Sequence, residues 1–337
     1  MRIWLIAIGL LALAVVGFLF VRGPSPSIIV APEHIFDLGP LAVTNTMFTS
    51  WLVVLFLCTV AVVAGRSLRL VPSGFSGAVE GLVGGFYGMI EGIVGERNAR
   101  RFFPLVATIF FYVLVSNYFG LLPVSNVIGR PEPGHGEKQV VFEQASIAGF
   151  DVALIPFGPQ ERDLAAGEEP IVAGEPGGQF SGLMSPFFRS VNTDINTPLA
   201  MAIFSFVFVE FWGFSAGGAG YLKKFFNFGR LLRGNAMGVI DVFVGLLELV
   251  SEFARMVSFT FRLFGNIFAG EVLLLMMGFL VPFVLVDVFY GLELFVGLIQ
   301  SFVFAMLTLV FAQSAVQHHG AGDQHEPSAH AETAHAH

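Results

Sequence analysis

The chain has 337 residues, of which 55% are hydrophobic and 12% are charged. A soluble domain carries about 25% charged residues, so the polar surface that an ordinary soluble enzyme needs is missing. The net charge of −8 argues against nucleic acid as a partner. A single cysteine, Cys58, excludes a disulfide framework and a cysteine metal site. The composition therefore predicts an all-α polytopic membrane protein.

Uncharged apolar runs of about 20 residues predict the spanning helices, because the hydrocarbon core of a bilayer is about 30 Å thick. The predicted runs are 3–21, 48–64, 102–122, 197–214 and a nearly continuous stretch over 236–316. The last stretch turns near Pro282 and would form two helices, over 236–281 and 283–317, that are far longer than the bilayer is thick. We therefore expect about four upright or surface helices, followed by two long helices that form a hairpin in the C-terminal half and are either strongly tilted or broken.

These runs divide the chain into consecutive parts. Residues 1–22 form an N-terminal hydrophobic helix, for which a retained anchor is favoured over a cleaved signal peptide. Residues 23–123 hold membrane helices, with a cytoplasmic surface hairpin of helices near 73–95. Residues 124–195 form an acidic outer loop that is too rich in Pro and Gly to be a span. Residues 196–317 hold the remaining membrane helices, which carry most of the buried charge.

Basic residues predict the orientation, since short cytoplasmic loops hold the excess of Lys and Arg. Five Arg lie between residues 65 and 101, and four Lys or Arg lie between residues 216 and 235. The segment 124–195 has ten acids against four bases, which is expected on the opposite side. We predict a multi-pass protein of the plasma (inner) membrane, with its C-terminal tail in the cytoplasm.

The tail, 318–337, contains six of the eight histidines of the chain. Metal binding and a disordered, solvated tail are both open interpretations, and the second is favoured because the spacing matches no defined set of ligands. We predict no metal site and no cofactor.

Ionisable residues within the long apolar stretch are the main functional signal, because each costs on the order of 3 kcal/mol at membrane depth and marks an ion path by default. At about 100° per residue, Glu248, Ser258 and Asn266 lie within roughly 40° of Arg262 and form one polar face. Glu271 lies about 180° round the same helix, so it is expected to face a different partner.

The following helix carries a second polar face. Glu293 and Gln300 are seven residues apart and lie nearly on one side of it. Two polar faces on adjacent helices can enclose a wet path through the membrane.

The residues from Ser258 to Glu271, Ser-Phe-Thr-Phe-Arg-Leu-Phe-Gly-Asn-Ile-Phe-Ala-Gly-Glu, resemble the signature of subunit a of the F-type ATP synthase. Segments 104–123, 194–200 and 294–311 support the resemblance, which covers roughly residues 30–318. It implies a stator subunit of the membrane sector that is not catalytic by itself. Such a subunit forms two proton half-channels and passes protons to and from a rotating ring of c subunits.

The resemblance also implies residue roles. Arg262 matches the essential arginine that faces the ring, and Gln300 matches its neighbour on the last helix. Glu271 and Glu293 match the pair associated with the outer half-channel.

Further positions match the lining of the two half-channels. Glu248, Ser258 and Asn266 match the cytoplasmic half-channel, whereas Asn117, Asp194 and Asn196 match polar positions near the outer side. Gly120 departs from the pattern, because some relatives carry an acid there, and we assign it no proton role.

The implied partners are the c-subunit ring, b-type peripheral stalk subunits, the remaining ATP synthase subunits and the lipid bilayer, with no nucleic acid. The main alternative is a secondary ion-coupled solute transporter, which usually shows internal repeats with paired broken helices. The charged segment has no counterpart in the first half of this chain. A purely structural anchor would leave Arg262, Glu271 and Glu293 as uncompensated costs.

Overall fold

The computed structural model describes most of the chain outside the two ends and several loops. The described residues are 9, 11–13, 15–16, 28–66, 74–122, 125, 128–133, 138–147, 150–154, 161–163, 179–218, 220–221, 225, 237–281 and 284–317. Most of the predicted helix 1–22 and the whole His-rich tail 318–337 lie outside these residues. All four bases of the predicted cytoplasmic loop at 216–235 also lie outside them.

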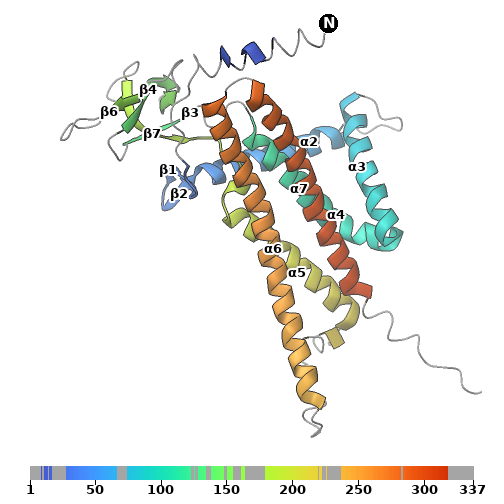
Figure 1. Ribbon diagram of the computed structural model, residues 1–337. Coiled ribbons are helices and arrows are strands. Elements are labelled where there is room, and N and C mark those ends of the chain that lie inside the picture. The colour runs from blue at the N-terminus through green and yellow to red at the C-terminus, as the bar shows by residue number, and fades with distance from the viewer. Residues whose placement is uncertain are drawn as a thin grey trace, which may run out of the picture. The chain divides into compact units, whose positions relative to one another are not determined.

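Five described helices are long and apolar enough to cross a membrane, which confirms the all-α polytopic architecture (Figure 1). They are α2 (Asn45–Arg66), α4 (Glu96–Gly120), α5 (Asn196–Gly217), α6 (Met237–Leu280) and α7 (Val284–Gln317). The two long helices α6 and α7 are continuous and not broken. The 44 residues of α6 measure about 66 Å, so this helix must tilt steeply or extend beyond a hydrocarbon core of about 30 Å.

One helix, α3 (Gly74–Val94), replaces the helical hairpin predicted near 73–95, which is wrong. The segment contains many glycines, each of which costs about 1 kcal/mol in a helix interior. The helical hydrogen bonds nevertheless run through the whole segment. The turn lies at Gly95, whose φ of 78° is a left-handed value that favours glycine, and α4 begins at the next residue.

The acidic segment 124–195 is not wholly irregular, because it contains five antiparallel strands. They are β3 (Ile128–Pro133), β4 (Lys138–Ile147), β5 (Phe150–Leu154), β6 (Glu161–Asp163) and β7 (Gln179–Pro186). The strand order is β5-β3-β7-β4-β6, and β5 also pairs with β4, so four strands close on themselves. The run Val-Val-Phe in β4 is typical of a strand, whereas Pro and Gly are common in the connections. A separate hairpin, β1 (His34–Leu38) and β2 (Leu41–Thr44), leads into α2.

The chain forms two compact units, and α3 to α7 each contribute residues to both. Unit 1 contains 1–80, 108–198 and 260–303, whereas unit 2 contains 81–107, 199–259 and 304–337.

Unit 1 is held together by polar as well as apolar contacts between α2, α4 and α7. The hydroxyls of Ser50 on α2 and Tyr112 on α4 lie 2.9 Å apart. Tyr118 of α4 donates a hydrogen bond of 3.2 Å to the carbonyl oxygen of Leu294 on α7. Such interhelical hydrogen bonds are common in membrane proteins, where helices gain little from hydrophobic burial against each other.

Unit 2 joins α4, α5, α6 and α7. The rings of Phe102 on α4 and Trp212 on α5 lie 4.6 Å apart, and the hydroxyls of Ser205 on α5 and Thr308 on α7 lie 2.8 Å apart. Phe259 of α6 packs against Phe304 of α7 with a ring separation of 5.1 Å.

Candidate functional site

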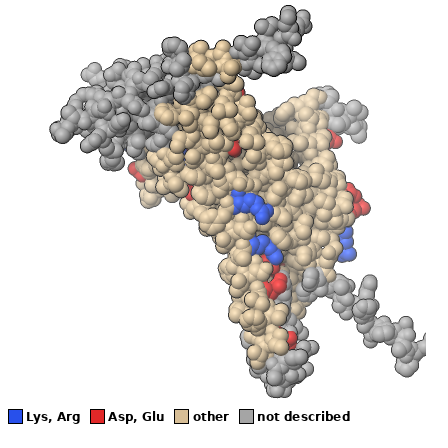
Figure 2. All heavy atoms as spheres, in the orientation of Figure 1, with Lys and Arg blue, Asp and Glu red and all other residues tan. Residues whose placement is uncertain are grey.

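Arg262 is an exposed side chain on α6, in unit 1. Within the described residues it makes no hydrogen bond and no ion pair. Its surroundings are apolar, since the adjacent Phe261 is also exposed. Figure 2 shows that the charged side chains on the visible face are few and surrounded by uncharged surface. A permanent charge at membrane depth is costly unless an anion or water compensates it.

Asn266 lies one helical turn beyond Arg262 and connects α6 to α7. Its amide Nδ2 donates a hydrogen bond of 2.9 Å to Oε1 of Gln300. Gln300 is buried, and its Nε2 atom has no hydrogen-bond partner among the described residues. The polar faces that the sequence predicts on the two long helices therefore meet at this pair.

Glu271 faces a different partner from Arg262, as its position on the helix suggests. Its carboxylate accepts hydrogen bonds of 3.2 and 3.3 Å from Nε of Arg189, with Nη2 at 3.3 Å from the same carboxylate. Both side chains are largely buried. Two parallel N–H donors facing one carboxylate fix its orientation as well as its charge.

Arg189 is one of the four bases of the segment 124–195, and no functional role was predicted for it. Its guanidinium also donates to the carbonyl oxygens of Ile29, at 2.6 Å, and Ala31, at 3.2 Å. Arg189 therefore ties the residues before β1 to α6. No local pattern predicts an ion pair across 82 positions, although an arginine directly after two phenylalanines and before a run of small polar residues is a weak signal of burial.

Glu293 on α7 is 7% exposed and makes no hydrogen bond or ion pair within the described residues. Its carboxyl group occupies the space that a Cβ atom would take at Gly270 on α6. Position 270 therefore requires glycine, because the Cβ atom of any other residue would displace this carboxyl group.

Asn117 on α4 connects to α7 and to the short helix η1 (Val191–Thr193). Its Nδ2 donates to the carbonyl oxygen of Gly297 at 3.2 Å, and its Oδ1 accepts from Asn192 at 2.7 Å. Along α7, Glu293, Gly297 and Gln300 follow one another at intervals of about 6 and 4.5 Å. Polar groups thus succeed each other along one side of the helix.

Gly120 lies against Ser190, and an added Cβ atom would fall 2.8 Å from the Cα atom of that residue. The space for an acidic side chain at this position is therefore filled.

Asp194 and Asn196 lie at the start of α5. The Oδ1 atom of Asp194 accepts hydrogen bonds from the backbone N–H of Asn196 at 3.0 Å and from its Nδ2 at 2.9 Å. Its Oδ2 atom accepts from the hydroxyl of Thr46 on α2 at 3.2 Å. These hydrogen bonds satisfy N–H groups at the start of the helix. Asp194 and Asn196 therefore stabilise the start of α5.

Several buried polar atoms of unit 1 have no hydrogen-bond partner among the described residues. They include the hydroxyls of Ser116 and Ser190 and the Oδ1 atom of Asn192. Buried polar groups are normally satisfied, and bound water is the usual partner where protein groups are lacking. The region round Asn117, Glu293 and Gln300 therefore suits a chain of water molecules.

Two further candidate residues lie on α6 in unit 2. Glu248 is half-buried and Ser258 is exposed. Neither belongs to the polar contacts round Glu293 and Glu271 described above for unit 1. Among the residues that the structure describes, no group of His, Cys, Asp and Glu could hold a metal ion.

Comparison with known proteins gives one consistent result. The family model described as ATP synthase A chain matches residues 47–313. A Gloeobacter violaceus protein named ATP synthase subunit a is 28% identical over 311 residues, which cover 92% of this chain and 98% of that protein. A Geobacter protein of the same name is 26% identical, covering 80% of this chain and 86% of its own length. A Pelobacter propionicus protein named ATP synthase subunit a 1 is 27% identical, with 85% and 92% covered.

Proposed function

We propose that this chain, which belongs to the ATP synthase subunit a family, moves protons through the polar residues of α4, α6 and α7 described above. It is a multi-pass membrane protein and the proton-translocating stator subunit of the membrane sector of ATP synthase. No observation favours a solute transporter.

Arg262 is proposed to face the ring of c subunits. The single observation that carries this proposal is an exposed arginine, in a membrane-spanning helix, that has no anionic partner among the described residues. A carboxylate on each c subunit would supply that partner. Such a carboxylate must cross lipid in its protonated form, since a bare charge there is too costly.

The positive charge of Arg262 drives proton release. Close to an arginine the ionised form of a carboxyl group is favoured, so each arriving c subunit gives up its proton there. Arg262 itself stays charged under all relevant conditions, and it therefore blocks a direct proton leak between the two half-channels. Moving one charge across 100 mV supplies about 2.3 kcal/mol, which the turning ring passes on to ATP synthesis.

The outer half-channel is proposed to run past Asn117, Glu293 and Gln300. Glu293 is the better proton carrier of the two outer carboxylates, because Glu271 is held by Arg189 whereas Glu293 has no protein partner among the described residues. Asp194 and Asn196 support the mouth of this path by holding the start of α5.

The inner half-channel is proposed to follow Glu248, Ser258 and Asn266, which share the flank of α6 that carries Arg262. The chain would not be catalytic by itself. Its partners would be the c ring, b-type stalk subunits and the rest of the complex, in the plasma membrane, with the C-terminal tail in the cytoplasm.

Substitution of Arg262 tests the proposal. Arg262→Ala should abolish proton-driven ATP synthesis by the complete complex in reconstituted vesicles. Arg100→Ala is the matched control, because Arg100 is an exposed residue that pairs with Glu96, one turn away on α4, at 2.6 Å and also interacts with Tyr87. Normal ATP synthesis by an assembled Arg262→Ala complex would refute the assignment.

A further inference from the structure

Unit 2 contains a second arginine on α6, seven residues before Arg262 on nearly the same flank of the helix. This residue, Arg255, donates a hydrogen bond of 2.6 Å from Nη1 to the carboxylate of Glu252. The Glu252 side chain is 2% exposed, whereas that of Arg255 is 26% exposed. A carboxylate is therefore fully enclosed within the subunit, with its counter-ion at the edge.

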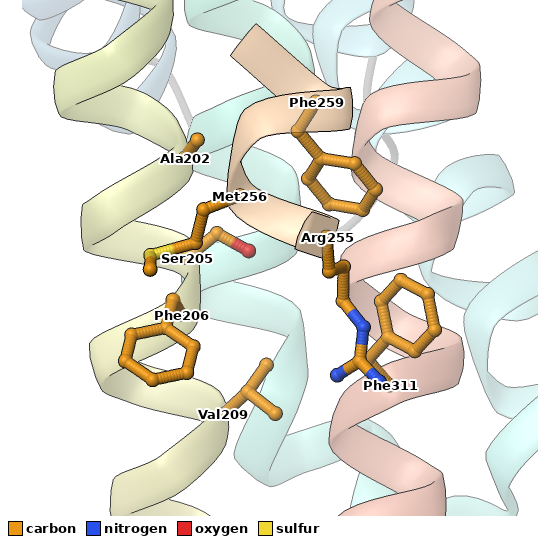
Figure 3. A pocket seen from close by; sticks show the side chains of 8 residues that line it. All are labelled: Ala202, Ser205, Phe206, Val209, Arg255, Met256, Phe259 and Phe311. Atoms are coloured by element: carbon orange, nitrogen blue, oxygen red, sulfur yellow. The ribbon is translucent and has the colours of Figure 1, made fainter. Parts of the chain in front are cut away.

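Arg255 also lines a small pocket between α5, α6 and α7 (Figure 3). Its guanidinium carbon lies 3.8 Å from the ring centre of Phe311 on α7. Figure 3 shows the guanidinium beside this ring, with Val209 and Phe206 of α5 across the pocket. The cavity is about 10 Å³ in volume, which is close to the space that one water molecule needs, and Ser205 gives its wall a hydroxyl group.

Two further groups face the same ion pair. Tyr221, which follows α5, is 3% exposed and interacts with Glu210 of α5, with Glu252 and with Arg255. Its ring occupies the space beside Gly213, where an added Cβ atom would lie 2.6 Å from two ring atoms. Glu210, Tyr221, Glu252 and Arg255 are called the Glu252 cluster below.

Stability alone gives a weak reason for such a cluster. Burying an ion pair costs about as much as the attraction returns, and apolar residues of similar volume often serve as well. By contrast, a buried carboxylate whose basic partner lines a water-sized cavity, with a second carboxylate and a phenol close by, has the groups that a proton relay needs. Burial, together with the negative charge of Glu210, raises the pKa of Tyr221, so the phenol keeps its proton and acts as a donor.

We propose that the Glu252 cluster is a proton station of the inner half-channel, reached by way of the pocket lined by Arg255 and Ser205. This proposal rests on the proposed function of Arg262. A proton passes from pocket water to the carboxylate of Glu252, then through the hydroxyl of Tyr221 to Glu210, and from there to the aqueous side. Each step transfers one proton between oxygen atoms, so no further reactant is needed.

The charges round Glu252 explain how its carboxyl group loses the proton again after each transfer. Arg255 stays charged, and its attraction for the carboxylate favours loss of the proton from Glu252. The other titratable groups that face the site are Tyr221 and Glu210 on the α5 side and Glu248 one turn away on α6, whereas α7 contributes the uncharged Phe311.

The test uses the complete ATP synthase in liposomes, with the catalytic sector outside, so that the bath is the cytoplasmic side. The initial rate of ATP-driven proton pumping is measured as the bath pH is varied at a fixed internal pH. We expect Glu252→Gln to lower the rate per complex about tenfold or more and to change its dependence on bath pH. Glu252→Asp, which keeps a carboxylate, should restore most of both.

Controls separate this proposal from a structural role and from the proposed function. Glu96→Gln removes an exposed ion pair in the same unit and should leave the rate and the pH profile unchanged. Arg262→Ala must abolish pumping, and pumping by that variant would refute the proposed function instead. An assembled Glu252→Gln complex with the wild-type rate and profile would overturn the relay.

A second variant decides the question if Glu252→Gln fails to assemble. Tyr221→Phe keeps the buried ring and removes only the hydroxyl, and it should slow pumping and shift the bath-pH profile. A wild-type profile in Tyr221→Phe would then overturn the proposal.

Discussion

Gly270→Ala is the sharpest test of how the outer half-channel is built. A Cβ atom at position 270 would fall on the carboxyl group of Glu293, which is the far end of a flexible side chain. The backbone of α6 therefore has no need to move. Instead, the Glu293 carboxyl group must shift by on the order of 1 Å to regain van der Waals contact distance.

The expected change in stability is small. Replacing Gly by Ala within a helix stabilises it by about 1 kcal/mol, and a strained rotamer of Glu293 costs about 0.5 to 1.5 kcal/mol. These two effects nearly cancel, so we expect the free energy of unfolding to change by less than about 1 kcal/mol. Proton flux should respond far more, because a displacement of about 1 Å at a reacting group can cost about 100-fold in rate.

The assay combines thermal unfolding of the assembled complex with proton flux in reconstituted vesicles. Gly278→Ala is the matched control on the same helix, since an added Cβ atom there would meet only Val286 at 3.9 Å. We expect Gly278→Ala to keep normal flux and Gly270→Ala to lose most of it. Adding Glu293→Asp, which shortens the side chain by one methylene, should restore part of the flux of Gly270→Ala.

Wild-type flux in an assembled Gly270→Ala complex would refute the reasoning. It would mean either that the position of the Glu293 carboxyl group does not matter for transport or that the proton does not pass it.

Three further predictions concern other parts of the chain. Arg189→Ala should destabilise the subunit by about 3 to 5 kcal/mol, because it leaves Glu271 buried without its partner, and the thermal midpoint of the complex measures this loss. The pKa of Tyr221 is raised in the folded chain, so above pH 10 the unfolded chain loses the phenol proton first and the free energy of unfolding should fall as pH rises. This slope is at most about 1.4 kcal/mol per pH unit. Tyr221→Phe should remove it in unfolding measurements at alkaline pH. In a Cys58→Ser background, Asn266→Cys should crosslink to a cysteine in an adjacent c subunit, whereas the buried control Leu263→Cys should not.

The helices of the last third could be predicted closely from sequence. The expected ranges 236–281 and 283–317 differ from α6 and α7 by one residue at three of their ends. Uninterrupted apolar residues in a membrane leave the backbone no alternative to a helix, and Pro282 gives an unambiguous turn. The glycine-rich α3 was predicted wrongly, because it is one helix over its whole length and the turn falls at Gly95.

Contacts between distant residues could not be predicted in this way. The ion pair of Arg189 with Glu271 and the fit of Glu293 beside Gly270 both join segments that no helical period relates. The strands between 128 and 186 were not predicted for another reason, since the apolar run of β4 is short and Pro and Gly are common around it.

Four charged residues of the long helices form two groups, whose substitution should have different effects. Glu271 and Glu252 have basic partners within the subunit, at 3.2 and 2.6 Å. Arg262 and Glu293 have none among the described residues, and we propose that the rotor and water supply their partners. Removing Arg189 or Arg255 leaves a buried charge unpaired and should therefore lower the amount of assembled complex.

Removing the charge of Arg262 or Glu293 should leave the amount of assembled complex normal and lower the proton flux, because no partner within the described part of the subunit depends on that charge. Glu293→Gln should assemble in normal amounts and slow proton flux, and quantifying the subunit in purified complexes beside the flux measures both. If Glu293→Gln instead prevented assembly while the flux per remaining complex stayed normal, Glu293 would be a structural residue and the division between the two groups would be wrong.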